Sequence, residues 1–412
     1  MKKSLLASVT LAAMLAPTAV FAEGYGIIEH HAEGVAMGGA AMFIENDAGN
    51  MAYNPAGITL CEGKQIKVSA TYISPHGHER TWVDSIPFAV EDRRNRVHPA
   101  WAPGSYYVRK IDDKQWFGIG CFSRFGNMSE FEAGTLAATN NRLAKMQGLS
   151  ITPTYARQAG RKFYWAVGAD INYVKLELQK DFSAISPAMG RNQIEGKTWA
   201  LGWNAGMRYA ATAKDEFGFA YRSKIAHTMD ADFDWYGFGP LGLGNTAHGK
   251  VTLPDSYHLG YSHKFDDKNR VELGAIRTQW HNFKSLRMTL DRPVPLGVTE
   301  TTSVHNWKDT WRYAIGYEHK FSKKYTGMLG FAFDDDGVPY DGGQFMVPVG
   351  CRRTYSIGMK YTDKWHTIAA TFGWQVEGNQ SFKGNGSTDA YTSAHCYDSI
   401  AKIFSIGYTY HF

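Results

Sequence analysis

The 412-residue sequence is poor in cysteine, has no strong excess of one charge, and has no long apolar run beyond its first residues. Its four cysteines, Cys61, Cys121, Cys351 and Cys396, lack the C-x-x-C spacing of a zinc or redox site. The net charge of +5 is too mild for nucleic-acid binding. No later stretch approaches the roughly 20 apolar residues of a membrane helix. The mean hydropathy of −0.36 fits a soluble protein or a membrane β-barrel, in which only alternate residues contact lipid.

The first 22 residues have the pattern of a secretory signal peptide. Lys2 and Lys3 precede an apolar run over residues 5–20, and Val20-Phe21-Ala22 forms a small-residue cleavage pattern. We therefore predict that the mature chain is exported and begins at Glu23.

Alternation of side chains is the main signal in the rest of the chain. At the C-terminus, large apolar side chains occupy every second position, and small or polar ones lie between them; the large ones are Phe404, Ile406, Tyr408, Tyr410 and Phe412. The same split recurs over residues 196–211, 311–318 and 354–361. The aromatic-rich face is expected to contact lipid, and the Gly-rich face with isolated charges is expected to line a lumen. A terminal Phe after such a strand is typical of barrels recognised by the outer-membrane insertion machinery.

Short polar turns alternate with longer segments along the chain. The turns lie at residues 112–113, 158–161, 213–215, 266–269, 322–324 and 362–364. The longer segments lie at roughly 75–102, 125–147, 179–194, 233–254, 287–302, 335–351 and 379–398. Six turns and seven loops predict an all-β, transmembrane antiparallel barrel of about 14 strands, starting near Gln65. Four cysteines allow three disulfide connectivities, and we favour Cys351 with Cys396 because both fall in predicted neighbouring loops.

Residues 23–62 precede the barrel and are rich in glycine and alanine. Small residues permit close packing in a confined space, and plugged lumens occur in barrels of this kind. The predicted organisation is therefore a signal peptide (1–22), an N-terminal plug or hatch (23–62) and an outer-membrane β-barrel (63–412).

Three motifs carry a family resemblance. "EGVAMGGAA" (33–41) followed by "DAGNMAYNPAGI" (47–58) resembles the N-terminal hatch of the FadL-like family, and "WFGIGCFSRFGN" (116–127) resembles that family's kinked third strand. The resemblance implies a monomeric bacterial outer-membrane transporter of long-chain fatty acids or other hydrophobic molecules. It further implies capture by apolar outer loops, transfer to a lumenal site, and lateral release into outer-membrane lipid through a gap in the barrel wall.

Candidate ligand-binding residues fall into two groups. The apolar group lies in two predicted outer loops and comprises Phe182, Ile185, Phe233, Trp235, Phe238 and Leu241. The alternative is that these side chains only pack the loops over the barrel mouth. The cationic group, Arg208, Arg312 and Lys360, is placed in the lumen by alternation and could bind a carboxylate. Equally, these cations could pair with lumenal acids such as Glu318.

The family resemblance also implies a gate. Its candidate residues lie in the hatch and in the third strand: Asn54, Pro55, Ala56, Gly118, Gly120 and Phe125. Proline fixes a turn and glycine tolerates a break in strand pairing.

Other functions are compatible with a membrane barrel of this kind. A general diffusion porin for small polar solutes is the main alternative, and a surface adhesin is a third. An enzyme is not expected, because no strand places Ser and His in a recognisable constellation. No cofactor or metal is predicted, since the His30-His31 and His76-Gly77-His78 motifs have no third ligand in a fixed relation.

Overall fold

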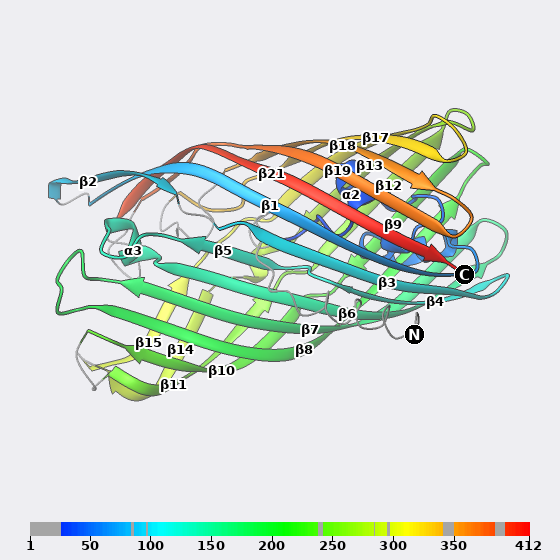
Figure 1. The fold of residues 1–412 in the computed structure, drawn as a ribbon. Helices are drawn as coiled ribbons and strands as arrows, with labels where there is room; N and C mark the ends of the chain where they lie inside the picture. The colour runs from blue at the N-terminus through cyan, green and yellow to red at the C-terminus, as the bar shows by residue number, and fades with distance from the viewer. Residues whose placement is uncertain are drawn as a thin grey trace, which may run out of the picture.

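In the computed structural model, the alternating segments form long antiparallel strands that close into one barrel (Figure 1). The structure describes residues 26–83, 86–95, 98–237, 242–283, 285–294, 297–340, 350–383 and 392–412. Closure is made by the first and last strands, which pair from Gln65 with His411 to Trp82 with Ser393. The predicted signal peptide lies outside the described residues. None of the helices within the described ranges is long and apolar enough to span a membrane.

The barrel wall is assembled from strand segments of very different lengths. They are β1 (Lys64–Val83), β2 (Ile86–Asn95), β3 (Ala100–Asp112), β4 (Gln115–Phe122), β5 (Gly126–Glu130), β6 (Leu143–Ala159), β7 (Phe163–Asp181), β8 (Arg191–Ala210), β9 (Asp215–Arg222), β10 (Ile225–Trp235), β11 (Gly242–Leu253), β12 (Ser256–Lys264), β13 (Asn269–Thr278), β14 (Ser285–Val294), β15 (Val298–Val304), β16 (Thr310–Lys320), β17 (Tyr325–Asp334), β18 (Arg352–Thr362), β19 (His366–Glu377), β20 (Gln380–Phe382) and β21 (Ser393–His411). In seven cases, two successive segments are the two halves of a single kinked wall strand. These pairs are β2–β3, β4–β5, β9–β10, β11–β12, β13–β14, β15–β16 and β19–β20. Merging them gives the predicted 14 strands in the described part of the chain.

The two ends of the barrel differ. All six predicted short turns are confirmed, and they lie at the end where β21 finishes, which is the right-hand end in Figure 1. At the other end, most of the predicted long loops are wrong, because strands extend into them. Residues 75–102 contain the β1–β2 hairpin, and residues 287–302 contain much of the β14–β15 hairpin. A strand rises about 3.3 Å per residue, so the length of a 20-residue strand such as β8 is much greater than the height of the apolar band, which is about 25 Å.

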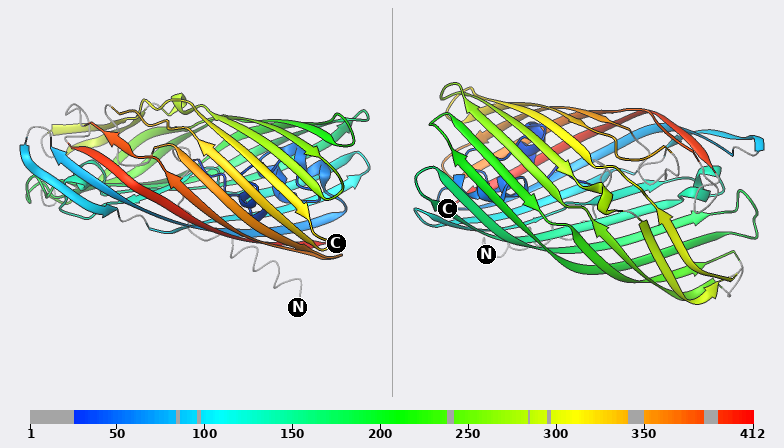
Figure 2. Two further views of the ribbon diagram at one scale, coloured as in Figure 1. Left: turned by 90° about the horizontal axis from the view of Figure 1, so that it is seen from above. Right: turned by 180° about the vertical axis from the view of Figure 1, so that it is seen from behind.

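The hatch (residues 26–62 of the described chain) lies inside the barrel, in the half that carries the short turns (Figures 1 and 2). It contains α2 (Ala32–Ala36), η1 (Ala48–Ala52) and η2 (Pro55–Leu60). The side chains of His31, Asp47 and Asn54 cap these three elements by accepting backbone N–H groups two or three residues ahead. Glycine in the wall permits close approach, since a Cβ on Gly330 would lie 2.2 Å from the Gly38 nitrogen.

Within the described residues, two short helices lie outside the hatch. They are α3 (Leu136–Asn140), after β5, and η4 (Trp280–Asn282), which forms the kink between β13 and β14.

The two faces of the wall only partly match the expected pattern. The lipid-facing prediction is confirmed: Trp199, Leu201 and Trp203 are 57%, 75% and 54% exposed. The expectation of a uniformly small and polar lumen is wrong. Around the hatch, glycines and charged residues face the interior together with large apolar wall residues such as Tyr106, Trp116 and Met328, and beyond the hatch the interior holds a second, larger apolar cluster.

All four cysteines are free thiols in the structure, including Cys351 and Cys396. The favoured disulfide is therefore not present.

Candidate functional site

The interior beyond the hatch is an apolar cluster contributed by inward-facing positions of many strands. Its members include Met146, Val174, Leu176, Met229, Phe233, Val251, Leu286, Met288 and Trp280. Trp280 is fully buried because the η4 kink turns the chain inward, and its ring lies 5.0 Å from that of Trp307 and 6.3 Å from that of Phe125. We call this set the apolar interior. Its members pack against one another as a single cluster, with Phe182 against its edge.

A small polar cavity, here called the polar cage, lies where the apolar interior meets the hatch. Its polar lining comes from His30, Arg124, Arg222, Ser256, His258 and Thr278. Phe125 belongs to both sets and so joins the cage to the apolar interior. The free space is about 30 Å³, which is room for roughly two water-sized groups.

The polar cage carries an excess of positive charge. Arg124 donates to Asp170 over 2.6 Å, and both side chains are buried. Arg222 instead donates to the carbonyls of Met51 and Ala52, and within the described residues it forms no ion pair. Arg124 Nη2 and Arg222 Nε and Nη1 are buried without a hydrogen-bond acceptor. A buried cation without an anion is costly, so this cage favours an anionic oxygen ligand.

His30 does not add to this charge. Burial, the Arg222 guanidinium and the neighbouring rings of His31 and His258 lower the pKa of His30 well below its usual value. The ring is therefore neutral at pH 7. Its Nδ1 lacks a hydrogen-bond partner, as does Nδ1 of His258.

The wall is broken beside the polar cage. β4 ends at Phe122 and β5 begins at Gly126, which confirms the predicted kink in the third wall strand. β4 pairs with β3 and β6, but within the described residues β5 pairs only with β6. The start of the hatch covers the kink, since Gly26 forms a β-bridge with Phe125 and the Ile27 N–H donates to the Arg124 carbonyl over 2.9 Å. We call Gly26–Ile28 the strap.

A buried ionic cluster, here called the latch, fixes the hatch to the wall. Lys67 of β1 donates to Glu33 over 2.5 Å and to both oxygens of Asp47 over 2.7 Å. His31 lies beside the two carboxylates, and the three could together hold a metal ion. The Lys67 ammonium already bridges the carboxylates, so it supplies the cation there.

The predicted apolar residues are brought together, but several of them are not in loops. Phe233 and Trp235 lie in β10 and are buried, with only 2% and 8% exposure. Phe182 follows β7 and stacks on Trp235 at 5.8 Å, while Ile185 is exposed. The remaining two candidates, Phe238 and Leu241, lie outside the described residues. The placement of Phe233 and Trp235 on an outer loop is therefore wrong, although the two segments do lie side by side.

The predicted cations lie at the hatch and are engaged by acids. Arg208 donates to Glu216 over 2.7 Å and to Thr59 over 3.3 Å. Arg312 donates to Asp334 over 2.6 Å and to the Gly38 carbonyl over 3.1 Å. Lys360 lies 3.7 Å from Glu318, which also accepts from Arg270 over 2.7 Å. Of the two interpretations of these cations, pairing with lumenal acids fits this arrangement.

The predicted gate residues are not grouped around the wall break. Asn54 donates to the Met207 carbonyl over 3.0 Å, and a Cβ on Gly206 would meet Asn54 and Pro55, so this turn faces β8. Ala56 is buried beside it, within η2. The third-strand glycines are regularly paired on both sides; Gly118 pairs with Val108 and Thr154, and Gly120 with Tyr106 and Thr152. Only Phe125 lies at the break.

Sequence analysis missed the polar cage and the latch. Arg124 lies within the third-strand motif, immediately before Phe125, and this position could have identified it as a candidate binding residue. Arg222 and His258 carry no motif, and only the closed barrel brings them to His30.

A closed barrel with an internal hatch, a broken wall strand and an apolar interior defines an outer-membrane transport barrel. The family model "Outer membrane protein transport protein (OMPP1/FadL/TodX)" matches residues 13–412, so the chain belongs to this family. The predicted outer-membrane location and transport class are thereby confirmed, and an enzyme is excluded.

Individual relatives are distant but cover most of the chain. The chain is 23% identical over 398 residues to the Long-chain fatty acid transport protein of Escherichia coli K12, covering 86% of this chain and 87% of the relative. It is 23% identical over 410 residues to Outer membrane protein P1 of Haemophilus influenzae, covering 88% and 87%.

Solved structures share the fold. A Pseudomonas aeruginosa FadL homologue superposes with a TM-score of 0.82 at 19% identity, covering 94% of this chain and all of that one. The Pseudomonas putida toluene transporter TodX gives a TM-score of 0.69 at 18% identity, covering 95% and 99%.

Proposed function

We propose that the protein carries long-chain fatty acids across the outer membrane. The acyl tail enters between the Phe182 and Trp235 segments and occupies the apolar interior, and the carboxylate binds in the polar cage. The observation that carries this proposal is Arg222, a buried cation without an acidic partner among the described residues, in the cage that Phe125 joins to the apolar interior. Bonds from a guanidinium to a carboxylate are among the stronger hydrogen bonds in proteins.

The route out passes through the wall break. A carboxylate drawn to Arg124 and Arg222 binds next to the Arg124 carbonyl that anchors the strap at Ile27. We infer that occupancy of the cage displaces the strap, so that the ligand leaves sideways between β3 and β5 into lipid. Asn54 to Ala56 would then act on the gate only indirectly. Arg222 also donates to the carbonyls of Met51 and Ala52, just before that turn, so a ligand that binds Arg222 would shift the turn and η2.

Two alternatives are less well supported. A diffusion porin needs an open polar constriction, whereas here the hatch and the apolar interior occupy the lumen. The second alternative is transport of a neutral hydrocarbon; TodX, for example, is named a toluene transporter. Such a ligand could occupy the same apolar interior but would leave Arg222 without a ligand.

The test compares an acid with its methyl ester. Replacing Arg222 by glutamine should weaken binding of a long-chain fatty acid about tenfold or more, because a hydrogen bond to a charged group contributes about 1.5–3 kcal/mol. Binding of the methyl ester should change little. The assay is displacement of a fluorescent fatty acid from purified protein in detergent.

The matched control is Arg208→Gln, which removes a buried arginine that is already paired with Glu216. It should leave the ratio of acid to ester affinity unchanged. Equal affinity of the wild-type protein for acid and ester would contradict the carboxylate site and favour a neutral hydrocarbon.

A further inference from the structure

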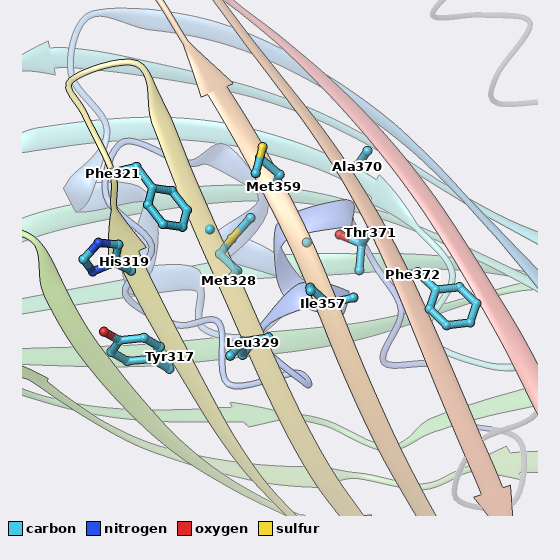
Figure 3. Close-up of a pocket in the computed structure, with 12 residues that line it drawn as sticks. Tyr317, His319, Phe321, Met328, Leu329, Ile357, Met359, Ala370, Thr371 and Phe372 are labelled. Carbon is cyan, nitrogen blue, oxygen red and sulfur yellow. The ribbon is translucent and has the colours of Figure 1, made fainter.

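The lipid-facing wall carries a groove that lies outside the proposed transport route. It lies on β16–β19 on the outside of the barrel and encloses about 740 Å³ between apolar side chains (Figure 3). Leu329, Ile357 and Met359 line it and are 51%, 56% and 52% exposed, which places them on the outward face. The hatch lies behind these strands in the same view. This volume is within the range of about 300–1,000 Å³ typical of small-molecule sites.

Residue size explains the groove. Gly327, Met359 and Ala370 are register partners across β17, β18 and β19, so two of three neighbouring outward positions have almost no side chain. The next row toward the membrane centre, Leu329, Ile357 and Phe372, is bulky. The groove is therefore a dip in the surface. It is not a hole, because the backbone pairing of β16 to β19 is continuous beneath it. Its occupant must come from the membrane.

One end of the groove is cationic. Phe321, at the groove edge, begins the short turn that carries Lys323 and Lys324, and the neighbouring turn carries Lys364. The two turns are in contact, since the Thr362 N–H donates to the Lys324 carbonyl over 2.8 Å. All three lysines are exposed, and none forms an ion pair with the described part of the chain.

The three lysines outnumber the acidic groups that the structure describes near this end. Asp363 accepts from the N–H groups of Trp365 and His366, each over 2.8 Å. Glu45 of the hatch pairs with Lys320 over 2.6 Å. Short turns of outer-membrane barrels face the periplasm, so this charge lies at the head-group level of the periplasmic leaflet.

We propose that this groove is a binding site for an anionic glycerophospholipid. One acyl chain fills the dip over Ala370, against the Phe321 ring that covers Gly327, and the phosphate contacts Lys323, Lys324 and Lys364. The charge of the rim selects an anionic head group, since each basic residue near a membrane surface adds to the attraction. This proposal is independent of the transported ligand.

Native mass spectrometry of the full-length protein, stripped of lipid and titrated with phosphatidylglycerol or phosphatidylcholine, tests the site. The wild-type protein should retain one phosphatidylglycerol in preference to phosphatidylcholine. Replacing the three lysines together by glutamine should weaken phosphatidylglycerol retention about tenfold or more, with little effect on phosphatidylcholine. Ala370→Phe should weaken both, because the ring fills the dip.

Ala169→Phe is the matched control, since Ala169 is an exposed, lipid-facing residue on β7, away from the groove. It should retain phosphatidylglycerol like the wild type. Photo-crosslinking with a diazirine-bearing phosphatidylglycerol should label Met359 and Ile357. Uniform labelling around the barrel, equal retention of the two lipids, or cross-linking of a second copy at this face would each overturn the proposal.

Discussion

Replacing Lys67 by methionine will release the hatch from the barrel wall while the barrel itself stays folded. The substitution removes the ammonium that bridges Glu33 and Asp47, and all three side chains are buried. Breaking a buried ion pair by removing one partner costs about 3–5 kcal/mol, because the remaining charges are left uncompensated. The backbone hydrogen bonds between the wall strands do not involve the Lys67 side chain. The substitution therefore destabilises the packing of the hatch and not the barrel.

Two measurements report the release. Limited proteolysis should cleave the Lys67→Met hatch faster than the wild-type hatch, and the reconstituted variant should conduct ions more strongly. The matched control is Lys110→Gln. Lys110 also joins the hatch to the wall, through Glu62 over 2.8 Å, but at an exposed site, and exposed pairs contribute only about 0–1 kcal/mol. Equal effects of the two substitutions would show that the latch does not hold the hatch.

The latch should also persist in acid. Burial alone raises the pKa of Glu33, but the Lys67 ammonium and the His31 ring outweigh it and hold that pKa well below 4.5. The folded pKa is thus depressed, so the stability that Glu33 contributes is present above about pH 4.5 and is lost as the pH falls through the folded pKa. Hatch proteolysis in the wild type should stay slow from pH 7 to about 4.5 and accelerate only below. Acceleration already near pH 6 would contradict this account.

The sequence predicts the membrane-embedded wall well, for a simple reason. Successive side chains of a strand point to opposite faces, and lipid requires the outward ones to be apolar. Trp199, Leu201 and Trp203 therefore mark the outward face of β8 without any tertiary information. The short turns are equally local, because tight connections at the periplasmic end need only a few polar residues.

The same rule fails beyond the bilayer, and β10 shows why. Its inward side chains include Met229, Phe233 and Trp235, and its outward ones include Asp230 and Asp232. Here the apolar face is turned to the interior and the acidic face outward, because the strands outreach the hydrocarbon. Alternation alone gives two faces but not their direction, so the sequence predicts a loop from residue 233, where β10 in fact continues to Trp235.

The polar cage and the latch could not be predicted from the sequence. Lys67 meets Glu33 and Asp47 across the boundary between hatch and barrel, and Arg222 meets His30 only after the barrel closes. Such contacts depend on the position of the hatch inside the lumen. Local propensity and periodicity carry no information about that position.

Locking the strap to the wall should stop transport. In a variant without the four native cysteines, we would replace Gly26 and Phe125 by cysteine, because these residues are partners in a β-bridge. Partners of an antiparallel bridge lie about 4.5–5.5 Å apart at Cα, which suits a disulfide. The reduced variant is its own control, because only the covalent bond differs.

Uptake of a labelled long-chain fatty acid by cells carrying this double-cysteine variant is the most direct test of lateral release through the wall break. We predict background uptake when the disulfide is formed and recovery of uptake on adding a reductant, with equal amounts of folded barrel in both states. Uptake that proceeds at the same rate with the strap covalently fixed would contradict the account.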